Sequence, residues 1–234
     1  MHSSARSSWG SVVLEGDVFG ADEESLEAPR ESLVAELELY RRQFEKVKVE
    51  VNQLASPLDD AEFNARPAGG GWSVAECLAH LNITNASYLP PIDDAILAAR
   101  EQKRLGRGPF KHSMLGKYFA RSLEPPVKRK FGTPKSFVPE PKAYRVGVVL
   151  PTFITFQDQL IERVHAANGV DLWKVKVRSQ FNRFFRFSLG DTFAILLAHE
   201  RRHLWQARKV LEGPGVLGPG ARGNEEEGVH RPRA

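Results

Sequence analysis

Two histidines stand four residues apart late in the chain, in the run His199-Glu200-Arg201-Arg202-His203. On an α-helix, side chains at i and i+4 leave the same face, so both imidazoles can reach one metal ion. The run also fits the H-E-x-x-H pattern of zinc metalloproteases, in which the glutamate is the general base. Because the pattern fixes only three positions, a pair of surface histidines near the helix end is an equally open interpretation.

A metalloprotease would need a further ligand downstream of these histidines. In the longer pattern H-E-x-x-H-x-x-G-x-x-H, Gln206 and Lys209 stand where glycine and histidine are required. Glu212 would lie about 13 Å along the helix axis from His203, at a rise of 1.5 Å per residue. The protease is therefore the least favoured alternative.

Glu200 follows His199 directly and points about 100° away from it around the helix. We therefore expect Glu200 to be a charge on the helix surface and not a base. Gln206, three residues beyond His203, lies closer to the metal-binding face. We assign no catalytic residue, and Glu200 and Gln206 are candidates only.

A third histidine, His80, shares one face of a predicted amphipathic helix with Cys77 and Thr84. Helical bundles build metal sites from side chains on facing helices. His80 together with the pair on the last helix would give three nitrogen ligands and an open coordination position, which is typical of catalytic sites. His165 lies near a predicted helix end, where a positive charge is favoured. The other histidines are expected to be solvated: His2, His112 and His230.

The helices that would position these side chains follow from apolar residues recurring at steps of three and four. The first is predicted over residues 31–55. The second begins at Ser73, which can form a capping box with Glu76. It continues toward residue 104, and Pro90-Pro91 should bend or divide it.

A third helix should begin at Pro151 and end at Asn168-Gly169, and a fourth should begin near Asp191 as the N-cap and end near residue 212. Residues 172–189 suggest a short strand followed by a loop. The glycines and prolines of 105–150 predict a long irregular connection, in which Met114 to Ser122 could form a short helix. The expected fold class is all-α, a four-helix bundle with a long connection between helices two and three.

Composition predicts one domain with a tail at each end. Residues 1–29 predict a mobile N-terminal extension, 30–212 the bundle, and 213–234 a disordered C-terminal tail rich in glycine, proline and charge. No apolar run approaches the roughly 20 residues of a membrane helix, and we find no secretory signal. We therefore expect a cytoplasmic protein. Its single cysteine excludes an internal disulfide framework.

The basic charge of the chain is local. Between Arg100 and Arg145 there are 13 lysines and arginines against three acidic residues, whereas the net charge of the whole chain is only +4. Such a segment can bind an acidic partner or an anionic metabolite, or simply be solvated. Few aromatic residues are interleaved with these charges, so nucleic acid is not favoured as a partner.

Three stretches resemble the DinB-like superfamily of metal-dependent enzymes: 63–67 (FNARP), 71–81 (GWSVAECLAHL) and 198–207 (AHERRHLWQA). The resemblance covers roughly residues 30–212. It implies a four-helix bundle with one metal-binding histidine on the second helix and two on the last, which correspond to His80, His199 and His203. It also implies zinc or nickel as the metal, and a homodimer.

Characterised relatives implied by this resemblance are bacillithiol S-transferases and mycothiol-dependent maleylpyruvate isomerase, in which the metal binds and activates a low-molecular-weight thiol. The resemblance therefore implies a thiol-dependent transferase or hydrolase acting on a small molecule. The basic connection suggests that the thiol is anionic, with Lys128, Arg129 and Lys130 as its counter-charges. The alternative is a non-enzymatic bundle with a vestigial metal site and a basic partner-binding surface.

Overall fold

The computed structural model describes residues 32–127, 132–182 and 184–213. The predicted N-terminal extension, all but the first residue of the predicted C-terminal tail, and Lys128, Arg129 and Lys130 lie outside the described residues. Helices dominate the described part, where the paired strands form a single hairpin, and the predicted all-α class is confirmed. None of the described helices combines the length and apolar character that a membrane-spanning segment requires.

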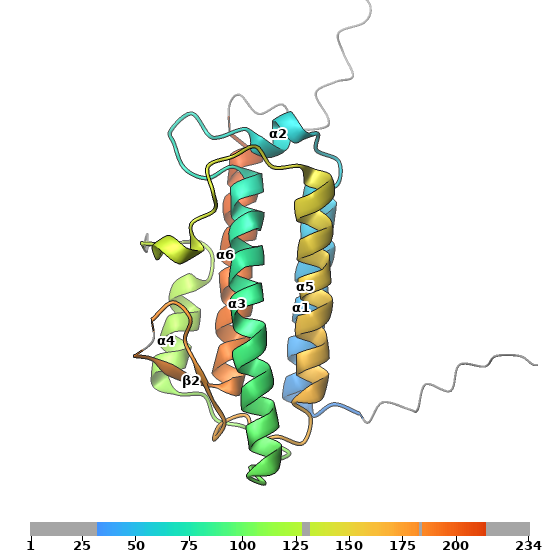
Figure 1. Cartoon of the computed structure of the whole chain (residues 1–234), viewed down its shortest axis with the longest axis vertical. Coiled ribbons are helices and arrows are strands. Elements are labelled where there is room, and N and C mark those ends of the chain that lie inside the picture. The colour runs from blue at the N-terminus through green and yellow to red at the C-terminus, as the bar shows by residue number, and fades with distance from the viewer. Residues whose placement is uncertain (1–31, 128–131, 183, 214–234) are drawn as a thin grey trace, which may run out of the picture. The chain divides into compact units, whose positions relative to one another are not determined.

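Four long helices pack side by side: α1 (Ala35–Ala55), α3 (Val74–Glu101), α5 (Val146–Ala166) and α6 (Leu189–Leu211). Helix α3 packs against α5 and α6, and α1 packs against the same two helices (Figure 1). The predicted periodicity of the first helix is confirmed, because its apolar stripe is buried. Large side chains from all four helices are fully buried between them: Phe44, Leu81, Phe153 and Phe193.

Helices α3 and α5 run in the same direction (Figure 1). Asn82 near the start of α3 donates to the carbonyl oxygen of Val149 at 3.0 Å, and Arg100 near its end donates to that of Ala166 at 2.8 Å. The chain must therefore travel back along the full length of the helices between them. This requirement explains why the connection is long.

The connection is partly helical. It contains α4 (Met114–Leu123), at the place where a short helix was predicted, and the short 3₁₀ helix η1 (Lys135–Phe137). Helix α4 packs against α6. The Asp191 side chain lies so close to Gly116 that a β-carbon there would overlap its carboxyl group.

The short helix α2 (Asp60–Asn64), which the sequence patterns did not predict, anchors the end of the connection. A capping box between Asp59 and Glu62 begins the helix. At its last residue, the Asn64 amide donates to the carbonyl oxygen of Tyr144 at 2.7 Å and accepts from the Tyr144 N–H at 2.8 Å. The backbone leading into α5 is thereby held in a fixed position.

Helix α3 begins as predicted but does not break where expected. Ser73 Oγ accepts from the Glu76 N–H at 3.1 Å, and the Glu76 carboxylate accepts from the Ser73 N–H at 3.0 Å. Pro90 and Pro91 lie inside one continuous helix, so the prolines do not divide it. Each proline costs the helix one hydrogen bond, but burial of apolar neighbours such as Ile92 stabilises the segment on both sides.

Three further local features differ from the predictions, namely the starts of two helices and the number of strands in one segment. Helix α5 begins five residues before Pro151, and α6 is capped by Ser188, whose hydroxyl accepts from the Asp191 N–H at 3.0 Å. The stretch expected to hold one strand and a loop holds two short strands, β1 (Lys176–Arg178) and β2 (Arg186–Ser188), which pair antiparallel.

Asp191 does not cap α6 because its side chain belongs to a polar cluster at the start of α4. His112 Nδ1 lies 2.8 Å from Asp191 Oδ1, and His112 Nε2 lies 3.0 Å from Glu36 Oε1. The Ser113 hydroxyl donates to the same aspartate at 2.6 Å. The expectation that His112 is solvated is therefore wrong, since it links α1 and α6 to α4.

Acid should weaken this cluster. Burial raises the pKa of Asp191, but hydrogen bonds from Ser113, His112 and Ser188 outweigh burial and leave the pKa below its ordinary value. The stabilisation is therefore present above the unfolded-state pKa and is lost as pH falls through the lower folded-state value. We expect Asp191→Asn to lower the free energy of unfolding by about 1–3 kcal/mol at pH 7.

Urea unfolding at several pH values checks this expectation, and the gap from the original protein should narrow below about pH 4. Asp94→Asn, which changes an exposed carboxylate on α3, is the control and should have little effect. A gap that stays constant down to pH 3 would contradict the role of the carboxylate.

The close approach of α4 to α6 should tolerate no side chain at Gly116. We expect Gly116→Ala to lower the free energy of unfolding by about 1–3 kcal/mol through overpacking against Asp191. Gly147→Ala is the matched control, because no atom lies within 4 Å of the β-carbon it would add in α5. That control should be neutral or slightly stabilising, and equal effects of the two substitutions in thermal unfolding would refute the close contact.

Candidate metal centre

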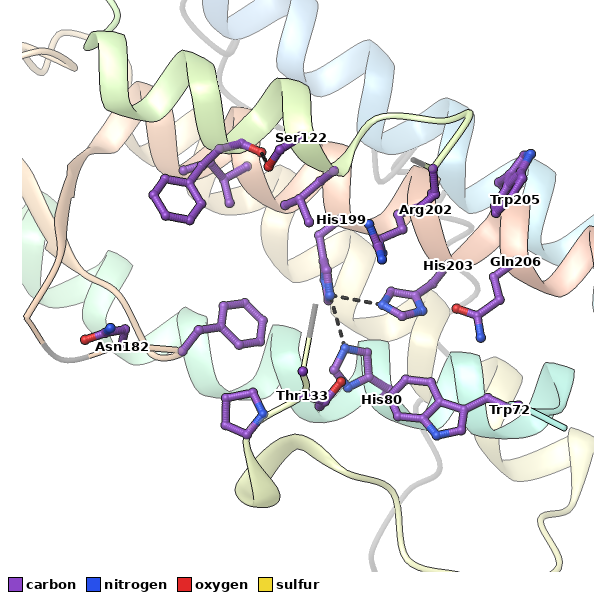
Figure 2. A pocket seen from close by; sticks show the side chains of 18 of the residues that line it. Trp72, His80, Ser122, Thr133, Asn182, His199, Arg202, His203, Trp205 and Gln206 are labelled. Carbon is purple, nitrogen blue, oxygen red and sulfur yellow. Dashed lines mark hydrogen bonds between the residues drawn. The ribbon is translucent and has the colours of Figure 1, made fainter. Parts of the chain in front are cut away.

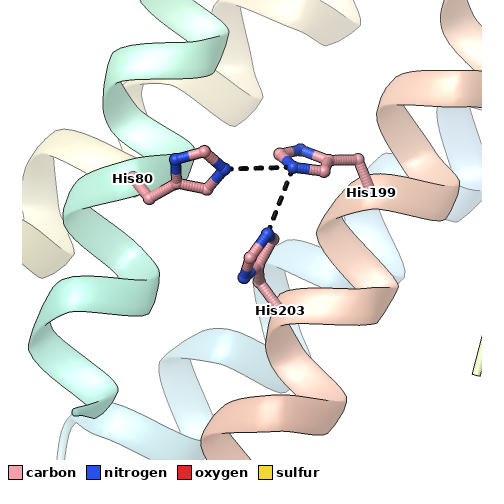
Figure 3. Close-up of side chains that lie close together, drawn as sticks. All are labelled: His80, His199 and His203. Atoms are coloured by element: carbon pink, nitrogen blue, oxygen red, sulfur yellow. Dashed lines mark hydrogen bonds between the residues drawn. The ribbon is translucent and has the colours of Figure 1, made fainter. Parts of the chain in front are cut away.

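Three histidine side chains meet between α3 and α6. His80 comes from α3 and His199 and His203 come from successive turns of α6, and all three are buried. The Nε2 atom of His199 lies 3.1 Å from the Nε2 atom of His80 and 3.1 Å from that of His203 (Figure 3). The structure thus brings together the three residues that the sequence indicated as metal ligands.

The spacing of these nitrogens fits a metal ion. Zinc–nitrogen bonds of about 2.0–2.1 Å at tetrahedral angles place nitrogen ligands roughly 3.3–3.4 Å apart. One ligand atom from each histidine lies within 4.8 Å of those of the other two. The three imidazoles could therefore hold one ion and leave a fourth position for another ligand.

The tautomer of His80 is fixed by the connection. Its Nδ1 atom lies 2.7 Å from the carbonyl oxygen of Phe137, which can only accept, so Nδ1 carries the proton and Nε2 presents a lone pair. Histidine ligands commonly donate their second N–H to a carbonyl oxygen in this way. Sequence reasoning missed this contact because a backbone acceptor leaves no residue-type signal.

The surroundings keep the imidazoles neutral, which is the form that binds metals. Burial lowers the pKa of His80, although the hydrogen bond to Phe137 partly opposes this. Burial lowers the pKa of His199 well below its ordinary value, with further lowering from His80 and Arg202. Burial likewise lowers the pKa of His203 well below its ordinary value, with further lowering from His199, His80 and Arg202.

Aromatic rings pack around the histidines. The Trp72 ring is stacked on His203, with centroids 5.7 Å apart, and lies 4.9 Å from His80. Phe181 meets His199 edge-on at 5.4 Å. Trp72 therefore lines the site as well as packing against the core.

The histidines lie on the wall of a cavity of about 750 Å³. Figure 2 shows His80, His199 and His203 converging there, with Trp72, Arg202 and Gln206 around them. Its walls come from α3, α4, α6, the hairpin and the connection. Phenylalanines make up much of the lining: Phe119, Phe181, Phe185 and Phe187. A small molecule could therefore reach the histidines in a largely apolar environment.

Glu200 does not lie on the helix surface as expected. It is completely buried, and its Oε1 atom accepts from the Asn85 amide at 2.9 Å and from the Gln157 amide at 2.7 Å. Burial raises its pKa to about 7, against the lowering effect of these hydrogen bonds. Glu200 therefore connects α6 with α3 and α5.

This placement affects both catalytic candidates. Glu200 is not among the residues that line the cavity, so a metalloprotease mechanism has no base at that position. Gln206 does line the cavity and lies beside His203, where it interacts with the imidazole without making a well-formed hydrogen bond to Nδ1. Cys77 is buried and burial raises the pKa of its thiol, so it offers no reactive thiolate.

The structural role of Glu200 can be tested by unfolding. Glu200→Ala removes the shared acceptor of two buried amides, and each unsatisfied group costs about 1–3 kcal/mol. Glu200→Gln keeps one carbonyl oxygen of the same shape and should cost much less. Free energies of unfolding from urea titrations compare the two variants, and an alanine variant as stable as the glutamine variant would rule out this role.

Comparison with known proteins places the chain in a family. The family model for the DinB superfamily matches residues 43–207, a span that includes all three histidines. No curated protein and no solved structure matches the chain. Because the family model covers well over half of the sequence, the chain belongs to the DinB superfamily.

Proposed function

We propose that the protein is a divalent-metal-dependent enzyme, a thiol-dependent transferase or hydrolase that acts on a small molecule. His80, His199 and His203 hold the metal, and a further coordination position faces the cavity. The observation that carries this proposal is the convergence of three Nε2 atoms on a cavity large enough for a small substrate. Membership of the DinB superfamily supports it.

The proposed centre uses neutral nitrogen donors alone. Imidazole nitrogen suits zinc and nickel, whereas magnesium and calcium prefer oxygen ligands. We therefore propose zinc or nickel as the metal. A divalent cation at this position lowers the pKa of a coordinated thiol, the chemistry that supplies a thiolate nucleophile at neutral pH.

The surrounding residues have defined roles in this proposal. The Phe137 carbonyl orients His80, and Trp72 restrains both rings, since it is stacked on His203 and packs at a tilt against His80. The aromatic walls keep water away from the reacting groups. The thiol comes from a second molecule, because Cys77, the one cysteine in the sequence, is buried in the core.

The four long helices supply the scaffold for this chemistry. We propose that α1, α3, α5 and α6 form the four-helix bundle that the family resemblance implies. Their packing supports it, since each of these helices contacts two of the others. In this arrangement the ligands come from two facing helices, as in other bundle metal sites.

Metal content tests the ligand set directly. Protein purified without a metal-affinity tag should contain about one zinc or nickel per chain by elemental analysis, and His80→Ala should lower that ratio sharply because one of three protein ligands is lost. His165→Ala, which changes a half-buried histidine on α5, is the control and should keep the metal. Full metal content in His80→Ala would refute the three-histidine site.

The same preparations test the reaction. The metal-loaded protein should accelerate transfer of a small thiol to a chromogenic electrophile, and His80→Ala should lose this activity while His165→Ala keeps it. A protein that retains its metal but accelerates no reaction across a panel of thiols would favour the non-enzymatic alternative.

A further inference from the structure

The cavity extends along α6 on both sides of the histidines. Its lining residues on this helix run from Ile195 to Val210, a span of about 22 Å at a rise of 1.5 Å per residue. Ile195 lies one helical turn before His199, about 6 Å along the axis. Figure 2 shows Asn182 of the hairpin loop on one side of the histidines and Gln206 on the other. A substrate that reacts at the histidines can therefore extend away from them along the helix.

Helix α4 places an aromatic ring at the end of the cavity nearest to the start of α6. Gly116 lies against Asp191, and Glu124 accepts from Arg201 at 3.0 Å, so α4 and α6 run side by side in the same direction. Phe119 lies between these two positions on α4 and lines the cavity. Its ring is therefore nearer to the start of α6 than the histidines are.

The hairpin completes an apolar section of the cavity, which we define by four lining residues: Phe119, Phe185, Phe187 and Ile195. The Phe119 ring packs edge-on against Phe185, with centroids 5.6 Å apart, and against Phe187 at 5.4 Å. Phe187 belongs to β2, the strand that directly precedes α6. Side chains from α4, the hairpin and α6 thus form one apolar end of the cavity.

Hydrogen-bonding groups near this section already have partners within the protein. The Tyr88 hydroxyl lies 3.3 Å from that of Ser179 and accepts from the N–H of the following residue at 3.1 Å. The Ser122 hydroxyl donates to the carbonyl oxygen of Phe119 at 2.8 Å. Among the described lining residues, charged side chains other than the histidines come from α6 beyond its first histidine. A polar group would therefore lose its hydration in the apolar section without gaining partners.

We propose that the substrate carries an uncharged aromatic or aliphatic group, that this group binds in the apolar section, and that Phe119 is the specificity-determining residue that limits its length. The inference rests on the proposed function in one respect, because the rest of the substrate reacts at the histidines. Burial of apolar surface supplies the binding free energy, which grows with each methylene group that fits. Phe119 sets the limit because its ring reaches from α4 to both phenylalanines of the hairpin and occupies space that a longer group would need.

Competitive binding to the full chain, stripped of metal, tests the proposal. Primary alcohols from butanol to decanol displace the uncharged fluorescent probe N-phenyl-1-naphthylamine. We expect each added methylene to strengthen binding about three- to fourfold until the apolar section is full, and no further gain beyond that length. Phe119→Ala should move this limit to longer alcohols, and Phe119→Trp should move it to shorter ones. Phe119→Leu, a milder change than alanine, should also move the limit to longer alcohols.

Leu115→Ala is the matched control, because it shortens an exposed apolar side chain of the same helix that does not line the cavity. It should keep the limit of the original protein, and circular dichroism should show which variants fold. Binding that does not depend on chain length, or a limit that is the same in the original protein and in every folded Phe119 variant, overturns the proposal.

The outcome is independent of the metal. If elemental analysis finds no metal but the length limit depends on Phe119, the proposed function fails while this inference stands. If the metal-loaded protein transfers thiols but the limit does not depend on Phe119, this inference alone fails.

Discussion

The three imidazoles come from two helices and meet only if α3 and α6 keep one register along their shared face. A slip of one residue would rotate a ligand by about 100° and move it about 1.5 Å along the axis. The hydrogen bond between Asn85 and Glu200 joins the same two helices, beside the histidine contacts. Because both partners are fully buried, breaking this bond leaves polar groups without water, and the register is therefore strongly specified.

The parallel direction of α3 and α5 imposes a long crossover, and the crossover supplies much of the site. Its 3₁₀ helix brings the Phe137 carbonyl to His80, and α4 brings Phe119 to the cavity. Contacts at both ends hold it, Asn64 with Tyr144 at one end and His112 with Asp191 at the other. The glycines and prolines of this segment indicate an irregular loop. The segment nevertheless contacts His80 and forms part of the cavity wall.

The charged residues of α6 lie in different surroundings. Arg201 and Arg208 pair with glutamates, Glu200 is buried among amides, and Arg202 faces the cavity. Consecutive residues of one helix thus face the core, the cavity and the histidine cluster, because each step of about 100° turns the side chain toward a different neighbour. The H-E-x-x-H run matches the protease motif only in its residue types and their spacing, since its glutamate faces the core.

The sequence by itself determined the all-α class, the capping box at Ser73 and the three histidines that come together. These follow from local rules, namely the periodicity of buried side chains and the i, i+4 spacing of His199 and His203 on one helical face. It also indicated the family through short motifs around His80 and His203. Helix positions were predictable because the face that a side chain occupies depends on the helix alone.

Only the tertiary structure decided what each face meets. Helical periodicity indicates that Glu200 points away from His199. It does not show that the side-chain amides of Asn85 and Gln157 donate hydrogen bonds to the Glu200 carboxylate. It placed His112 in a loop without revealing the carboxylates of Glu36 and Asp191 on either side. Such partners lie tens to more than a hundred residues apart in the chain, so no local pattern encodes them, and they exist only once the helices have packed.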